Sequence, residues 1–265
     1  MIAFVTIDII FTHTCIIPKK KDKIFSIFYA IIPHNMKEKI IFITLGIRYK
    51  RSFRIPETSG EIMDEILYND SSPFFDQYFT ILRNDGRNEK MVENDSGEYL
   101  RINTDDLIIR IAVKNNFDYK IKELKEKIIP FLEKNIFDKF SIRNIARFGV
   151  IYSYQIDNKI NLNKAIGVLS SGAIESPDAT SVSFSKKLAT SDSVKKDIND
   201  YINTIYNLNQ SNKDYFAELD YQYYYDPTCD TFTECDLPSK LDNSLKFAEN
   251  NFHIWLSSIC NNEKK

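Results

Sequence analysis

Glycine is scarce in this chain, with 7 residues among 265, whereas about 7% of the residues in an average protein are glycine. Loops that cradle phosphates need glycine for positive φ angles and for close approach of the backbone to the ligand. The sequence contains neither a G-x-G-x-x-G segment nor a G-x-x-x-x-G-K-[ST] segment. These absences argue against a dinucleotide-binding or P-loop enzyme of the usual kind.

Cysteine and histidine are also few. The four cysteines are Cys15, Cys229, Cys235 and Cys260. They are too few and too scattered for a disulfide framework, so we expect free thiols in a cytoplasm. Cys229 and Cys235 are separated by five residues, whereas zinc sites prefer two to four. The three histidines stand far apart, and no G-x-S-x-G nucleophile elbow occurs. We therefore predict no metal site, no cofactor and no hydrolytic triad.

Neither charge nor hydropathy points to a membrane or to a strongly anionic partner. The 35 basic and 37 acidic residues give a net charge of −2, so no global field attracts nucleic acid or lipid, although a local patch could. Residues 1–17 are apolar but include Asp8 and His13. This segment is too short and too polar to span a bilayer, and it lacks the basic start of a signal peptide. We expect a cytoplasmic protein without a membrane partner.

The N-terminal region has two interpretations. A basic run at residues 19–23 follows the apolar segment, and Met36 stands directly before the first strand-like pattern. One hypothesis is that Met36 is the native start and that residues 1–35 are an over-extended gene model. The other is that these residues form an additional edge hairpin. The intact mass of the protein expressed from its own gene distinguishes the two.

The first half of the chain has the pattern of strands followed by a helix. Residues 40–53 alternate between apolar and polar side chains, which predicts a strand, and a short helix follows from Pro56. Further strands are predicted at 75–82, 99–103 and 107–113, with a polar turn region at 84–97. Residues 119–135 carry apolar side chains at helical spacing, and Pro130 should kink or break this helix.

The second half repeats this order. Strands are predicted through Arg147 and at 215–225, with a short helix at 165–169 and an irregular loop at 226–238. The sequence of residues 170–193 fits a strand, a loop or both, and that of residues 197–210 fits a helix or a strand. The clearest helix is 241–260, with one apolar stripe. His253 lies about 100° from the centre of that stripe, so we expect it at the boundary between core and solvent.

These elements predict an α+β fold in which antiparallel sheets pack against two main amphipathic helices. The order suits two similar halves, at 36–140 and 141–265. No Gly- or Pro-rich linker separates the halves, so we expect them to pack together.

Three segments carry a resemblance to a known family. They are the Arg147–Tyr152 strand, the Phe216–Tyr221 strand, and the closing helix that begins at Leu241-Asp242. Together they resemble a sporadically distributed prokaryotic protein family of unknown function, over a region from about residue 37 to the C-terminus. The resemblance implies an α+β fold and a link to defence or mobile gene cassettes, and it implies no known reaction. Ile151, Tyr154 and Leu245 replace polar residues that are frequent in the family.

A basic strand face is the best binding signal. Arg48, Lys50 and Arg54 alternate along the first strand and its extension, so their side chains should point the same way. Arg143 and Arg147 would extend this face if the two strands pair. Several cations on one face suit phosphates or an acidic protein, whereas an ordinary solvated strand face is the alternative.

Two acidic residues and a tyrosine cluster offer further candidates. Glu218 and Asp220 lie two apart on one strand, and their carboxylates could share a divalent cation for phosphodiester hydrolysis. No motif supplies a third ligand, and a solvated polar face is the favoured explanation of the pair. The tyrosines at 221 and 223–225 suit either a core or a self-association surface. We therefore expect a non-catalytic binding or accessory protein with a protein or nucleic-acid partner, and a metal-dependent phosphodiesterase as the alternative.

Overall fold

The computed structural model describes residues 39–52, 54–74, 81–85, 89–114, 116–156, 179–190, 199–211 and 214–260. The two hypotheses for residues 1–35 and the helix predicted at 165–169 lie outside these residues.

A single nine-stranded sheet forms the centre of the molecule, with strand order β2-β3-β4-β5-β1-β6-β9-β8-β7. All neighbouring strands pair antiparallel. The strands are β1 (Ile40–Tyr49), β2 (Ile81–Asp85), β3 (Glu89–Glu93), β4 (Tyr99–Asn103), β5 (Asp106–Ala112), β6 (Ile145–Ile156), β7 (Ala179–Ala189), β8 (Tyr201–Ser211) and β9 (Asp214–Cys229). The predicted α+β class is confirmed, with one continuous sheet rather than separate ones.

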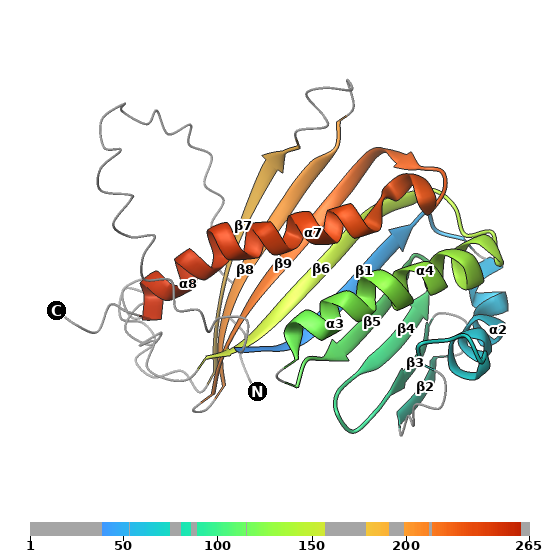
Figure 1. The fold of residues 1–265 in the computed structure, drawn as a ribbon, viewed down its shortest axis with the longest axis horizontal. Coiled ribbons are helices and arrows are strands. Elements are labelled where there is room, and N and C mark those ends of the chain that lie inside the picture. The colour runs from blue at the N-terminus through green and yellow to red at the C-terminus, as the bar shows by residue number, and fades with distance from the viewer. Residues whose placement is uncertain are drawn as a thin grey trace.

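Two long helices cover one face of this sheet (Figure 1). The first consists of α3 (Phe117–Glu123), η3 (Leu124–Ile128), α4 (Ile129–Phe131) and η4 (Leu132–Asp138). The second consists of α7 (Leu237–Phe247), η6 (Ala248–Phe252) and α8 (His253–Cys260), and it follows the short turn η5 (Thr233–Cys235). A shorter helix, α2 (Arg54–Tyr68), connects β1 to the β2 edge of the sheet.

Strand alternation determines which side chains face the helices. On β1 the buried side chains include Ile43, Leu45, Ile47 and Tyr49, as the alternating pattern predicts. On β6 the side chains of Phe148, Val150, Tyr152 and Tyr154 are buried on the same side, because β1 and β6 pair in register. The tyrosine hydroxyls find partners on the second helix: Tyr152 lies 2.7 Å from Ser244 Oγ, and Tyr154 lies 2.9 Å from His253 Nε2.

His253 is therefore not a boundary residue, and that expectation is wrong. Its side chain is 5% exposed and packs edge-on against the ring of Tyr154, with ring centroids 5.5 Å apart. The π-helical turn at η6 directly precedes His253. Such a turn rotates the following residues relative to an ideal α-helix, and this rotation carries His253 into the interface with the sheet.

Pro130 does not end the helix in which it occurs. The helix continues from Phe117 to Asp138, and π-helical turns flank the proline on both sides. A proline has no N–H for the α-helical bond to the residue four positions earlier, and its ring crowds that carbonyl. The wider π-helical turns accommodate this defect, so the apolar stripe continues across it.

Several element boundaries differ from the predictions. The undecided regions contain strands β7 and β8, and β3 lies within the region predicted as a polar turn. The predicted loop at 226–238 is shorter, because β9 extends to Cys229 and α7 begins at Leu237. Asp236 caps that helix, since its side chain accepts a hydrogen bond from Ser239 N.

The strand order places the two parts of the chain side by side. β1 and β6 lie next to each other in the middle of the sheet, and β5 and β9 return to pair with β1 and β6 respectively. Each returning strand is followed in sequence by the turn into one of the two long helices. The division into halves at residues 140 and 141 remains a prediction, and β1–β6 pairing crosses it.

None of the helices in the described part of the chain has the length and hydropathy that crossing a membrane requires.

Candidate functional site

The sheet face that points away from the long helices is polar at its centre. Four side chains form a row across neighbouring strands on this face, since Arg48 pairs with Arg147, Arg147 with Tyr224, and Tyr224 with Tyr201. The residues that alternate with them, such as Ile47 and Phe148, are buried under the helices. We call this row the arginine–tyrosine row. The row ends at Asp106 on β5, which pairs with Arg48 on β1.

Asp106 holds both arginines of the row. Arg48 donates from Nε and Nη2 to the two carboxylate oxygens of Asp106, at 3.0 and 2.9 Å. Arg147 Nη2 lies 3.8 Å from Asp106 Oδ1. The bidentate bond raises the pKa of Arg48 further above its usual value. Two guanidinium groups share one carboxylate, so one positive charge remains in this group.

A chain of hydrogen bonds continues from Arg147 along β9. Arg147 Nη1 donates to Tyr224 Oη at 3.3 Å, and Tyr224 Oη donates to Gln222 Oε1 at 2.9 Å. Gln222 Nε2 then donates to Asp220 Oδ2 at 2.6 Å. The ring of Tyr224 stacks on that of Tyr201, with centroids 4.6 Å apart.

The far side of this stack carries another cation. Lys187 Nζ lies 3.7 Å from the centroid of the Tyr201 ring, a geometry typical of a cation–π contact. Two stacked tyrosine rings therefore lie between two cations, across the strands β6, β9, β8 and β7.

The predicted carboxylate pair occupies the same face. Burial raises the pKa of Asp220 to about 6, against the lowering effects of Gln222 and Arg147. Glu218 accepts a hydrogen bond from Ser153 Oγ at 3.0 Å. Within the described residues, no group of three His, Cys, Asp or Glu side chains could hold a metal ion. Each of the two carboxylates has a neutral hydrogen-bond partner, Ser153 for Glu218 and Gln222 for Asp220.

A second cluster of cations lines a surface pocket of about 190 Å³ near the start of α2. Its basic residues are Lys50, Arg51, Arg54 and Arg143, and we call it the basic pocket. The remaining lining residues are Ser52, Ile55, Thr58, Phe140, Ser141, Ile142 and Asn144. They come from three segments: the end of β1, the first turns of α2, and the connection between η4 and β6.

Two of the four cations of the basic pocket are in ion pairs. Arg51 Nη2 lies 3.4 Å from Asp105 Oδ2, and Arg143 Nη1 lies 3.2 Å from Asp138 Oδ1. No hydrogen bond or ion pair joins the side chains of Lys50 and Arg54 to other described residues. The pocket therefore has a surplus of positive charge.

The wall formed by the η4–β6 connection has an unusual backbone. Ser141 and Asn144 have φ angles of 54° and 58°. These lie in the left-handed region, which residues other than glycine and asparagine seldom adopt. Backbone bonds keep both residues in place. Ser141 N donates to Asp138 O at 3.2 Å, Asn144 N donates to Asp230 O at 3.1 Å, and Lys50 N donates to Asn144 O at 3.0 Å. This wall is thus held at a defined distance from Lys50.

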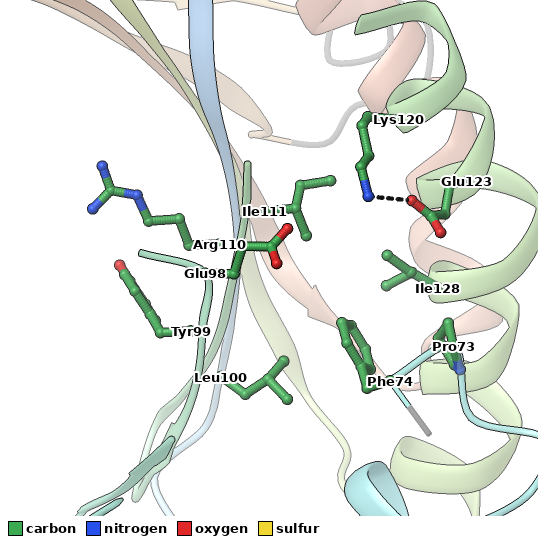
Figure 2. A pocket seen from close by; sticks show the side chains of 10 residues that line it. All are labelled: Pro73, Phe74, Glu98, Tyr99, Leu100, Arg110, Ile111, Lys120, Glu123 and Ile128. Atoms are coloured by element: carbon green, nitrogen blue, oxygen red, sulfur yellow. Dashed lines mark hydrogen bonds and ion pairs between the residues drawn. The ribbon is translucent and has the colours of Figure 1, made fainter. Parts of the chain in front are cut away.

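Another cavity, between the sheet and the first long helix, is a small packing gap. Figure 2 shows Phe74 and Ile128 pointing into it, with Lys120 bonded to Glu123 at its margin. Its volume of about 10 Å³ has room for little more than one water molecule.

The structure divides the five predicted binding residues between two places. Arg48 and Arg147 come together in the arginine–tyrosine row, because β1 and β6 pair, a pairing that the sequence left only as a condition. Lys50, Arg54 and Arg143 line the basic pocket. Sequence reasoning missed Arg51 and Asp106. Arg51 interrupted the alternation of the first strand, and this interruption could have indicated that the strand ends there.

The tyrosine cluster belongs mainly to the core. Tyr221, Tyr223 and Tyr225 are buried, and Tyr224 lies partly exposed on the open face. Cys229 and Cys235 are free thiols, as expected.

Comparison with models of known protein families finds no match. Comparison with curated proteins likewise finds no similar sequence. The resemblance to a sporadically distributed prokaryotic family remains a prediction.

Proposed function

We propose that this chain is a non-catalytic binding or accessory protein that contacts a nucleic-acid or protein partner through the basic end of β1. The observation that carries the proposal is the convergence of cations there. Lys50, Arg51, Arg54 and Arg143 line one pocket, and Arg48 lies two residues before Lys50, at the end of β1. A role in a prokaryotic defence or mobile cassette rests on the family resemblance alone.

Nucleic acid fits this end of the sheet better than an acidic protein does. Phosphate groups bind to clustered cations, and aromatic side chains next to them suit bases or sugars. Arg147, Tyr224, Tyr201 and Lys187 supply such a mixture on neighbouring strands, and Arg147 lies three residues after Asn144, which lines the basic pocket. The net charge of −2 confines the attraction to this local region.

A pull-down of tagged protein, with and without nuclease treatment, tests the proposal. We expect co-purifying nucleic acid that nuclease removes and that Lys50→Glu with Arg54→Glu abolishes. These two positions are preferable to Arg48, because a glutamate at 48 would stand beside the carboxylate of Asp106. The matched control is Lys127→Glu with Lys246→Glu, which makes the same charge change at exposed positions on the long helices.

The outcomes separate the two kinds of partner. A stoichiometric protein that survives nuclease and is lost with the same double variant would make the chain an accessory subunit. Recovery that is equal for the pocket variant and the control variant would refute binding at the basic end of β1.

The alternative function is a metal-dependent phosphodiesterase that uses Glu218 and Asp220. The described residues supply no third ligand beside this pair, so no observation favours it over the binding role. Hydrolysis of a phosphodiester that requires a divalent cation and disappears in Glu218→Ala would establish it and overturn the binding proposal.

A further inference from the structure

We propose that the basic pocket binds a terminal phosphate, a phosphomonoester at the end of a nucleic-acid strand. This inference rests on the proposed function, because it names the group of the partner that the pocket recognises. It is carried by the charge, the size and the position of the pocket.

The charge of the pocket matches a dianion. Asp105 and Asp138 pair with Arg51 and Arg143, which leaves the charges of Lys50 and Arg54 without an acidic partner among the described residues. A phosphomonoester has a second pKa near 6 and carries close to two negative charges at neutral pH, whereas an internal phosphodiester carries one. The surplus of two positive charges therefore suits the end of a strand better than its interior.

Hydroxyl groups complete the donor set. Ser52 Oγ accepts a hydrogen bond from Arg54 N, so its own hydrogen remains available for an anion in the pocket. Arginine and lysine form short charge-assisted bonds to phosphate oxygens, and arginine can do so with two N–H groups at once. The pocket thus offers the guanidinium of Arg54, which can donate two hydrogen bonds to one phosphate, the ammonium of Lys50, and the hydroxyl of Ser52.

The size of the pocket limits what can enter it. Its volume of about 190 Å³ is below the range of roughly 300–1,000 Å³ that is usual for sites enclosing a drug-sized ligand. A phosphate with part of its sugar fits, whereas a whole dinucleotide does not. Ile55, Phe140 and Ile142 form an apolar wall against which the carbon atoms of a sugar can pack.

The position of the pocket favours a strand end over a free phosphate ion. Lys50 N bonds to Asn144 O next to the start of β6, so the pocket lies at the same end of the sheet as Arg48 and Arg147. A strand with its terminal phosphate in the pocket can continue over the arginine–tyrosine row.

Binding of three probes to the full chain tests the inference. The probes are a short oligothymidylate with a 5′-phosphate, the same oligomer with a 5′-hydroxyl, and inorganic phosphate as a competitor. We expect the phosphorylated oligomer to bind at least about tenfold more tightly than its hydroxyl form. Lys50→Gln with Arg54→Gln should remove this difference, whereas Lys127→Gln with Lys246→Gln should retain it.

Each outcome distinguishes this inference from the function on which it rests. If both oligomers bind equally and inorganic phosphate does not compete, the terminal-phosphate site is refuted while nucleic-acid binding stands. If inorganic phosphate binds and the Lys50–Arg54 variant loses it, but neither oligomer binds, the pocket takes free phosphate and the proposed strand ligand is refuted. If no probe binds, the terminal-phosphate site and nucleic-acid binding are both refuted, and only a protein partner is left for the basic end of β1.

Discussion

At the scale of single residues, strand alternation does not by itself describe the environment of Asp220. Alternation places it correctly on the face away from the helices, together with Glu218. It does not reveal that burial raises the pKa of this carboxyl to about 6, although Gln222 and Arg147 act to lower it. Gln222 lies two residues away on β9, whereas Arg147 lies on β6 and is brought near Asp220 only by the register of the two strands.

We predict that the free energy of unfolding falls as the pH rises from about 4 to about 6. The pKa of Asp220 is higher in the folded state than its ordinary value of 3.8, so the folded protein binds more protons than the unfolded chain within this window. The loss on ionisation should be about 1–3 kcal/mol. Urea denaturation at a series of pH values measures it.

Asp220→Asn should abolish this contribution and stabilise the protein at neutral pH. Its amide oxygen can still accept the hydrogen bond that Gln222 donates. The control is Asp70→Asn, which removes an exposed carboxylate from a turn. A pH dependence that is the same in Asp220→Asn and in the wild type would contradict the raised pKa.

At the scale of the elements, apolar periodicity predicted the two long helices and the central strands. The spacing of Leu241, Leu245, Ala248 and Phe252 identified the second helix, and these residues face the sheet. The same reasoning could not place His253, because an ideal 3.6-residue period does not anticipate a π-helical turn. The sequence left strands β7 and β8 undecided because Lys186 and Thr204 interrupt the apolar side chains that alternate with Ser and Asn along them.

Phe252 should anchor the second helix to the sheet. Its side chain is fully buried and packs against Tyr154, Tyr206 and Trp255, with ring centroids 5.1–5.3 Å apart. Phe252→Ala should lower the free energy of unfolding by about 3–5 kcal/mol, because it leaves a cavity between helix and sheet. Ile254→Ala, two residues along the same helix and 42% exposed, should change it by only about 0.5 kcal/mol. Chemical denaturation of the two variants provides the comparison, and equal losses would contradict the packing described.

For the whole molecule, the continuous sheet has a consequence for cooperativity. β1 belongs to the first predicted half and β6 to the second. The two strands pair directly, from Ile40 to Tyr49 of β1, so the sheet is continuous across the predicted boundary. Separating the halves would expose the apolar side chains and the backbone bonds of both central strands.

We therefore predict one unfolding transition for the described fold. The sole tryptophan, Trp255, lies in the second half, so its fluorescence reports on that half, whereas far-UV circular dichroism reports on the entire sheet. The two signals should have coincident midpoints in urea. A second transition in circular dichroism after the fluorescence change is complete would mean that the halves unfold independently.

The sequence by itself determined the class of the fold, the buried face of β1, and the two amphipathic helices. These features depend on periodicities of two and of about 3.6 residues, which are local and can be read along the chain. It also predicted Arg48, Lys50, Arg54, Arg143 and Arg147 as binding residues, but not Arg51. Only the tertiary structure decided that Arg48 and Arg147 share Asp106 while Lys50, Arg54 and Arg143 line a pocket with Arg51. Strand order and register set these neighbours, and they depend on which strands pair over long sequence separations.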